Sequence, residues 1–280
     1  MSSRLKSAAR STIRLAYGAT RLDRHLRGGW LTAHATLRSG KYSAVSIDCF
    51  DTILSRWQPE WEQRAIAALA IELADRDSGS ADAILRRASV SAARTAAGGA
   101  EPSALAIWRS FCGFAGLPGA LADVLCRGEL ELLEASSALE DKALDFICAV
   151  IDRQLPLVVC SDTRWPAVFL CAVLQKKGLK MIQDALVCSC DYQKSKFRGD
   201  LFGVAKARLS AQAGRDICPA NILHIGDSRL SDIYSGASFG LTTILVDKSR
   251  VASIGGSSRS LHQNCLSKVR QDIHDHLSNR

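Results

Sequence analysis

The sequence predicts an α/β protein with a doubly wound parallel sheet and an inserted all-helical cap. Three observations support this prediction. An apolar run of strand type lies at 43–48, and similar runs alternate with helix-length segments after residue 154. Between them, the segment 59–153 has helical patterns only. Strands that alternate with helices of this length form βαβ units and a parallel sheet.

Residues 1–40 are predicted to form a basic N-terminal extension. They hold eight Lys or Arg and one acid, so almost all of the net charge of +8 lies there. Apolar residues at helical spacing indicate an amphipathic helix that contacts an acidic membrane surface or a partner. The alternative is an accessory helix or a solvated tail. In a eukaryote, the same composition is typical of an organelle transit peptide. Because the rest of the chain is nearly neutral, we expect no nucleic-acid partner.

The predicted core comprises residues 41–58 and 154–248. Its strands are expected at 43–48, 155–162, 184–189, 221–227 and 242–247, with helices at 166–178, 199–214 and 231–240. The insertion at 59–153 is rich in helix formers and is expected to fold as four to six helices. A Gly/Ser-rich linker and a last amphipathic helix, which is expected to dock on the body, make up residues 249–280.

Composition favours a reduced, cytoplasmic compartment. No apolar run reaches the ~18–20 residues of a membrane span, and the N-terminus lacks the apolar segment of a secretory signal. The ten cysteines include no CxxC pair, and several lie in apolar runs. Cys188 and Cys190 have no second ligand pair at zinc spacing. His224 lies inside an apolar strand, where we expect a core histidine with satisfied hydrogen bonds.

Polar groups follow three of the predicted strands. The motifs, in chain order, are Asp48-Cys49-Phe50-Asp51-Thr52, Ser161-Asp162, Lys196 with Gly199, and Gly226-Asp227 followed by Asp232. The carboxyl ends of parallel strands meet at one edge of a sheet, where open α/β folds bind ligands. Carboxylates there suit Mg²⁺, and a hydroxyl and an ammonium suit a phosphoryl group. The ordered set predicts a phosphoryl-transfer site.

These motifs resemble the haloacid dehalogenase (HAD) superfamily of hydrolases. The resemblance covers the predicted core, and the helical insertion lies where that superfamily has its helical cap. The segment from Ile47 to Arg56 is most similar to HAD-like proteins whose first motif is FDxFDTLxxR, which are often encoded near bacterial surface-polysaccharide and glycosyltransferase genes. The segments 160–162 and 191–202 also resemble that group.

The resemblance implies a Mg²⁺-dependent phosphatase of a small phosphorylated metabolite, such as a sugar phosphate, that acts through an aspartyl-phosphate intermediate. Asp48 would be the nucleophile. By the same resemblance, Mg²⁺ would be held by Asp48, the backbone carbonyl of Phe50, Asp227 and Asp232.

The remaining expected site residues bind substrate. Ser161 and Lys196 would hold and stabilise the phosphoryl group, and the Lys-x-x-Gly-x-Leu-Phe register favours Lys196 over Lys194. Asp162 and Arg56 are also expected to bind substrate. The alternative for Arg56 is a solvated surface charge.

One position departs from the common phosphatase pattern. Phe50 stands where many HAD phosphatases have a second aspartate, which serves as general acid and base. Asp51 is therefore a candidate acid/base, and its alternative role is a hydrogen bond that stabilises the turn. Because of Phe50, a dehalogenase and a phosphonatase are alternative functions. Asp227 argues against a dehalogenase. The insertion contains a single lysine, Lys142, which weakens the phosphonatase interpretation. A non-catalytic HAD-like binding protein is the third hypothesis.

Overall fold

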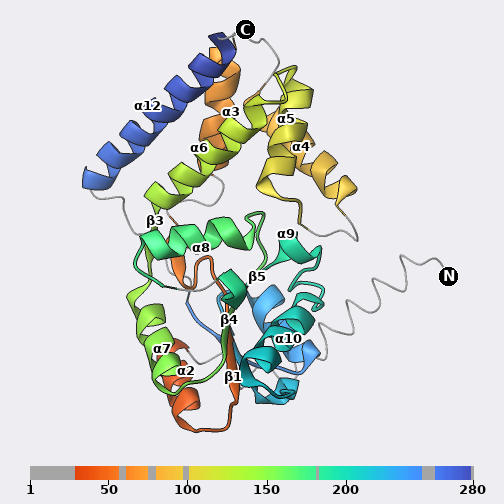
Figure 1. Ribbon diagram of the computed structural model, residues 1–280, viewed down its shortest axis with the longest axis vertical. Helices are drawn as coiled ribbons and strands as arrows, with labels where there is room; N and C mark the ends of the chain where they lie inside the picture. The colour runs from red at the N-terminus through yellow and green to blue at the C-terminus, as the bar shows by residue number, and fades with distance from the viewer. Residues whose placement is uncertain are drawn as a thin grey trace, which may run out of the picture.

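The computed structural model describes residues 29–56, 61–74, 80–96, 101–180, 183–247 and 256–278 of the 280-residue chain. The chain forms a sheet-containing core and a helical cap (Figure 1). Residues 1–28 and the linker at 249–255 lie outside the described residues. The membrane, partner and transit-peptide interpretations of the basic extension therefore stay predictions. None of the described helices is long and apolar enough to cross a membrane.

The core sheet has five parallel strands in the order β5-β4-β1-β6-β7. Their bounds are Leu186–Cys188 (β5), Leu157–Ser161 (β4), Ala44–Ile47 (β1), Ile222–Gly226 (β6) and Thr242–Leu245 (β7). The central strand β1 is buried at all four positions, as expected of a strand covered on both faces. The predicted α/β fold class with a parallel sheet is confirmed.

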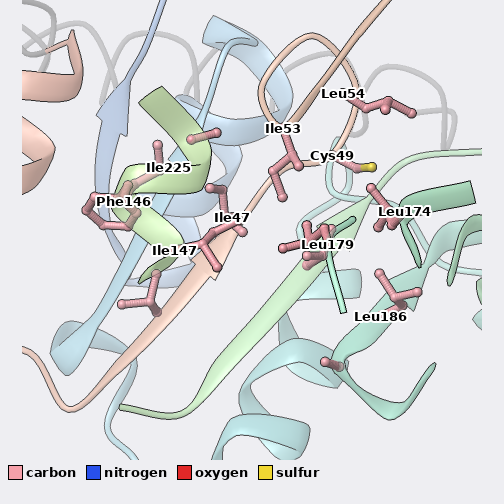
Figure 2. Close-up of a cluster of buried hydrophobic side chains, with 14 of the residues drawn as sticks. Ile47, Cys49, Ile53, Leu54, Phe146, Ile147, Leu174, Leu179, Leu186 and Ile225 are labelled. Carbon is pink, nitrogen blue, oxygen red and sulfur yellow. The ribbon is translucent and has the colours of Figure 1, made fainter. Parts of the chain in front are cut away.

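Helices cover both faces of this sheet. On one face, α2 (Gly29–Arg38), α7 (Asp141–Asp152) and α8 (Ala167–Lys176) contribute to one apolar cluster, and α10 (Leu201–Ala213) covers the other face. Figure 2 shows Phe146 and Ile147 of α7 gathered near Ile47 and Ile225 of the sheet. The alternation of side chains along each strand thus supplies two separate cores.

The first part of the chain that the structure describes belongs to this core. Helix α2 falls within the segment predicted as a basic extension, yet its Ala33 and Leu37 are buried. Residues 29–38 therefore pack on the core. Shorter elements complete this part of the fold: α9 (Ser189–Tyr192), α11 (Ser235–Phe239), 3-10 turns at Gln183–Ala185 and Pro219–Asn221, and a π-helix at Arg229–Tyr234.

The cap contains α3 (Trp61–Leu73), α4 (Ala81–Thr95), α5 (Ala104–Ala115) and α6 (Leu121–Ser136). Two short antiparallel strands, β2 (Leu54–Arg56) and β3 (Ser137–Leu139), connect it to the core. The sequence predicted no strand in 59–153, because a three-residue strand is too short to show a period. Helix α7 also lies in that segment, but it packs on the sheet rather than on the cap.

The C-terminal helix α12 (Gly256–Ser278) packs along α6 and α3 of the cap (Figure 1). Val269 and Ile273 are buried in the apolar cluster of the cap, whereas Cys265 and Leu277 are partly buried beside it. The predicted apolar face of this helix therefore contacts the insertion rather than the sheet.

Candidate active site

The four motifs converge at the carboxyl edge of the sheet. Asp48 follows β1, Ser161 ends β4, and Asp227 follows β6. Because β4, β1 and β6 are neighbours in the sheet, their ends meet at one place. Lys196 lies in the loop between α9 and α10, and its ammonium contacts the carboxylates of Asp48 and Asp232.

Asp232 reaches this place because Gly226 leaves room for it. A Cβ atom at position 226 would overlap the Asp232 carboxylate, so only glycine permits this approach. Asp232 lies in the π-helix Arg229–Tyr234, and the backbone N–H of Ser228 donates to its Oδ2 at 2.9 Å. The Gly-Asp sequence and the following helix thus aim a second carboxylate at the site.

The site is a buried cluster of opposite charges. The Lys196 Nζ lies 2.5 Å from Asp232 Oδ1 and is also ion-paired with Asp48, and all three side chains are almost fully buried. Burial alone would lower the pKa of Lys196, but Asp232 and Asp48 hold it well above its usual value. Burial alone would raise the pKa of Asp232, but Lys196 and His224 hold it well below. Lys196 is therefore an ammonium and Asp232 a carboxylate.

The pKa of Asp48 shifts in the opposite direction from that of Asp232. Burial raises its pKa to about 8, with Asp232 and Asp227 adding to the increase and Lys196 opposing it. Because burial and neighbouring carboxylates destabilise the ionised form of Asp48, a nearby cation would stabilise it.

Three carboxylates could share such a cation. Asp48, Asp227 and Asp232 each offer an oxygen atom, and these atoms all lie within 4.8 Å of one another. The Thr52 hydroxyl lies 3.2 Å from Asp48 Oδ2 and 3.4 Å from Asp227 Oδ1, so it joins the two carboxylates. Hard oxygen donors of this kind fit Mg²⁺. The role of the Phe50 carbonyl as a ligand stays a prediction.

Ser161 presents a buried hydroxyl at the end of β4. The side chain is 1% exposed, and among the described residues its Oγ has no hydrogen-bond partner. Buried polar groups are nearly always satisfied, so an orphaned hydroxyl at the strand ends indicates a ligand oxygen. This observation agrees with the predicted phosphoryl contact.

Asp162 positions the lysine loop. Its carboxylate accepts the backbone N–H of Lys196 at 2.7 Å and that of Phe197 at 3.3 Å. Both oxygens are therefore engaged with the backbone. The expected contact between Asp162 and substrate stays a prediction.

Asp51 and Arg56 are engaged with each other. Arg56 donates from Nε to Asp51 Oδ1 at 3.2 Å and from Nη2 to Oδ2 at 3.0 Å. Its guanidinium also lies over the ring of Phe50, 4.6 Å from the ring centre. Asp51 has φ 62°, a left-handed conformation that short polar residues tolerate. The Asp51 carboxylate is thus engaged by the guanidinium of Arg56.

His224 has partners on both ring nitrogens, as expected of a core histidine. Nδ1 lies 3.0 Å from Ser46 Oγ, and Nε2 lies 3.2 Å from Asp232 Oδ1. Burial lowers the pKa of His224, so the ring is neutral. From strand β6 it contacts the Asp232 carboxylate, a role that a single histidine in an apolar run does not reveal.

A small cavity of about 90 Å³ lies between the core and the cap beside this site. It is lined by Phe50, Arg56, Glu62, Glu101, Glu129, Leu133, Asp162, Thr163, Arg164 and Trp165. Sequence analysis did not find its cap residues, because no motif marks them.

No family model matches the sequence, and no curated protein matches it. Several solved structures do. Three of the solved structures that it resembles have HAD descriptions. One is a HAD family enzyme from Bacteroides thetaiotaomicron, with 12% identity over 76% of this chain and 97% of that chain, and a TM-score of 0.49.

Two others have similar scores. A HAD phosphatase from Thermococcus onnurineus has 18% identity over 76% of this chain and 89% of that chain, with a TM-score of 0.47. A protein described as a HAD-hydrolase from Bacillus subtilis, bound to magnesium, has 18% identity over 79% of this chain and 98% of that chain, with a TM-score of 0.46.

Proposed function

We propose that the protein is a Mg²⁺-dependent phosphatase that hydrolyses the phosphate monoester of a small metabolite through an aspartyl-phosphate intermediate. One observation carries the proposal: Asp48, Lys196 and Asp232 form a buried ion-pair cluster, and an Asp227 oxygen lies within 4.8 Å of an oxygen of each of the other two carboxylates. Phosphoryl transfer depends mainly on positioning and charge stabilisation, and these residues supply both.

Asp48 is the proposed nucleophile. One of its carboxylate oxygens attacks phosphorus, a bond forms between them, and the bond from phosphorus to the leaving alcohol oxygen breaks, with the leaving oxygen taking its proton from water. Lys196 contacts Oδ1, and the Thr52 hydroxyl lies 3.2 Å from Oδ2. These two contacts fix the carboxylate orientation. Water then cleaves the acyl-phosphate, which releases phosphate and restores Asp48.

The developing charge on the phosphoryl oxygens is stabilised by the chain itself. Lys196 carries a positive charge throughout, and Ser161 offers a hydroxyl with no other partner among the described residues. Asp48, Asp227, Asp232 and the Phe50 carbonyl would hold Mg²⁺, which supplies further positive charge when bound.

The contacts of Asp51 favour a positioning role over the acid/base role. Phe50 cannot transfer a proton, and the Asp51 carboxylate accepts two hydrogen bonds from Arg56. To act as acid or base, Asp51 would have to leave this ion pair. We propose that it instead holds Arg56 over Phe50, at the boundary between the site and the cavity.

Hydrolysis of p-nitrophenyl phosphate with Mg²⁺ tests the proposal. Asp48→Asn should lower kcat by about three orders of magnitude or more, because the nucleophile is lost. Asp123→Asn is a matched control, since Asp123 is exposed on α6 away from the site. EDTA should abolish the activity and Mg²⁺ should restore it. Turnover that survives Asp48→Asn would overturn the assignment, and EDTA-resistant turnover of a haloacid would favour the dehalogenase alternative.

A further inference from the structure

Three polar side chains form a buried layer across the sheet. Ser46 of β1, His224 of β6 and Thr243 of β7 are partners in the strand register, and each is fully buried. Leu223 and Ile225, the neighbours of the histidine along β6, lie in the apolar cluster on the opposite face. Polar groups buried in an apolar sheet are costly unless each finds a partner. The partners of His224 therefore indicate what this layer does.

Strand geometry places His224 beside Asp232. Positions 224 and 226 of β6 lie on the same face of the sheet, because side chains alternate along a strand. The Asp232 carboxylate occupies the space over Gly226, where a Cβ atom would overlap it. The imidazole ring thus lies next to this carboxylate, with His224 Nε2 3.2 Å from Asp232 Oδ1.

The ring of His224 is held in this orientation by three different elements. Nδ1 lies 3.0 Å from Ser46 Oγ on β1, and the ring packs edge-on against Phe202 of α10, with the ring centres 4.9 Å apart. A Cβ atom at Gly236 of α11 would lie 3.8 Å from His224 Cδ2, so the backbone there lies close to the ring. The imidazole therefore has little freedom to turn away from Asp232.

The partners of His224 also decide which ring nitrogen carries the proton. Asp232 is an ionised carboxylate beside the Lys196 ammonium, so it can only accept hydrogen bonds. Nε2 must therefore donate to Asp232 Oδ1, which leaves Nδ1 to accept from the Ser46 hydroxyl. A neutral ring makes both contacts only when the proton is on Nε2.

Asp232 passes this constraint on to the lysine. Its Oδ1 accepts from His224 Nε2 and from Lys196 Nζ, which lies 2.5 Å away, and its Oδ2 accepts the backbone N–H of Ser228. Three donors on one carboxylate fix both its position and its plane. The ammonium that also contacts Asp48 is therefore held by a carboxylate whose orientation His224 sets.

We propose that His224 is a positioning residue of the phosphoryl site: its Nε2–H fixes the Asp232 carboxylate and, through it, the Lys196 ammonium. The histidine does not touch the phosphoryl group and transfers no proton. Asp232 is also a proposed ligand of Mg²⁺, and groups that hydrogen-bond to a metal ligand orient that ligand. This inference rests on the proposed function, since it assigns His224 a part in phosphoryl transfer. The alternative is a histidine that serves folding alone.

The first test replaces the donor at position 224. In His224→Leu, kcat for p-nitrophenyl phosphate at saturating Mg²⁺ should fall about tenfold or more, while KM changes by less than about threefold. Glutamine can place an amide N–H near the position of Nε2, so kcat of His224→Gln should return to within about threefold of wild type. A folded His224→Leu protein with wild-type kcat, or an equal loss in both variants, would overturn the inference.

His34→Leu is the matched control, because His34 lies on α2 against the ring of Phe146 and away from the carboxyl edge of the sheet. Its kcat should stay within about twofold of wild type. A loss in this control as large as that in His224→Leu would show that the effect is not specific to position 224, and would also overturn the inference.

Two further measurements need no turnover. The affinity for Mg²⁺, measured by calorimetry with the metal alone, should weaken about tenfold in His224→Leu and stay within about threefold of wild type in His224→Gln. NMR of the wild-type protein with ¹⁵N-labelled histidine should show the His224 ring protonated at Nε2, assigned by the signal that His224→Gln lacks. Protonation at Nδ1 would overturn the inference even if His224→Leu does not fold.

These measurements separate the inference from the proposed function. If the wild-type protein does not hydrolyse p-nitrophenyl phosphate, the proposed catalysis fails. The ring tautomer and the Mg²⁺ affinities then still decide the inference, and a wild-type affinity in His224→Leu would overturn it. If the wild-type protein hydrolyses the ester and folded His224→Leu does so equally well, the inference fails and the proposed function stands.

Discussion

The contact between α6 and α12 offers a direct test of how the C-terminal helix is attached to the cap. Gly128 of α6 faces Val269 of α12. A Cβ atom at position 128 would lie 2.7 Å from Val269 Cγ1, 3.1 Å from Cγ2 and 3.3 Å from Ile66 Cδ1. Carbon atoms in ordinary contact are about 3.5–4.0 Å apart, so the nearest distance falls short by at least ~0.8 Å.

Gly128→Ala therefore combines a gain and a loss. Alanine is favoured over glycine in a helix interior by about 0.8–1.0 kcal/mol. Inserting a methyl group into a packed interior costs about 1–3 kcal/mol. The net change in unfolding free energy should range from none to a loss of ~2 kcal/mol. Gly113→Ala on α5 is the matched control, because its Cβ would meet nothing within 4 Å. That variant should gain ~1 kcal/mol.

Urea unfolding of the full chain measures both variants. We expect Gly128→Ala to be less stable than Gly113→Ala by about 1–3 kcal/mol. In a Val269→Ala background, Gly128→Ala should recover most of this difference, because the two γ-carbons that it meets first are gone. If both alanine variants are equally stabilised, α12 does not lie against α6 at this distance, and the described packing is refuted.

Three further predictions concern the site and the boundary between core and cap. Lys196→Met should lower kcat/KM with p-nitrophenyl phosphate by about 10²–10³, since it removes the charge beside Asp48; a loss below tenfold would contradict that role. Asp51→Asn should lower kcat less than tenfold, because the amide can still accept from Arg56, whereas a loss of ~10² or more would instead support the acid/base role. Burial raises the pKa of Glu129 above its usual 4.5, so the folded protein favours the protonated carboxyl. The stability that this group contributes is therefore present below pH 4.5 and is lost as the pH rises through the raised pKa. The stability difference between wild type and Glu129→Gln, measured by urea unfolding, should therefore narrow from pH 5 to pH 8; a constant difference would count against the raised pKa.

The sheet and the carboxyl-edge motifs could be predicted because their signals are local. A buried strand is a short apolar run, and the residue that follows it lies at the sheet edge by geometry. Asp48, Ser161 and Asp227 were placed in this way, and the structure brings them to neighbouring strand ends. Gly226 illustrates the same point. Position 226 must be glycine because the side chain of Asp232, only six residues further along the chain, lies against it.

The division between core and cap could not be predicted, because it depends on long-range packing. Helices α6 and α7 both have one apolar face, yet α7 packs on the sheet and α6 packs within the cap. Helix α12 shows an apolar stripe, but the stripe does not say which surface it covers. For the same reason, the motif did not reveal that Asp51, a candidate acid/base, and Arg56, a candidate substrate ligand, form an ion pair with each other.

The segment after Ser161 couples the phosphoryl site to the position of the cap. The backbone carbonyl of Arg164 accepts the N–H of Ala104 at the start of α5, and its guanidinium is ion-paired with Glu129 inside the cap. Both contacts would break if this part of the cap moved away from the segment after Ser161. The strand that offers the Ser161 hydroxyl therefore continues directly into the contacts that close the cavity. The cap residues that line this cavity are brought to the end of β4 only by such long-range contacts, which is why no motif in the sequence marks them.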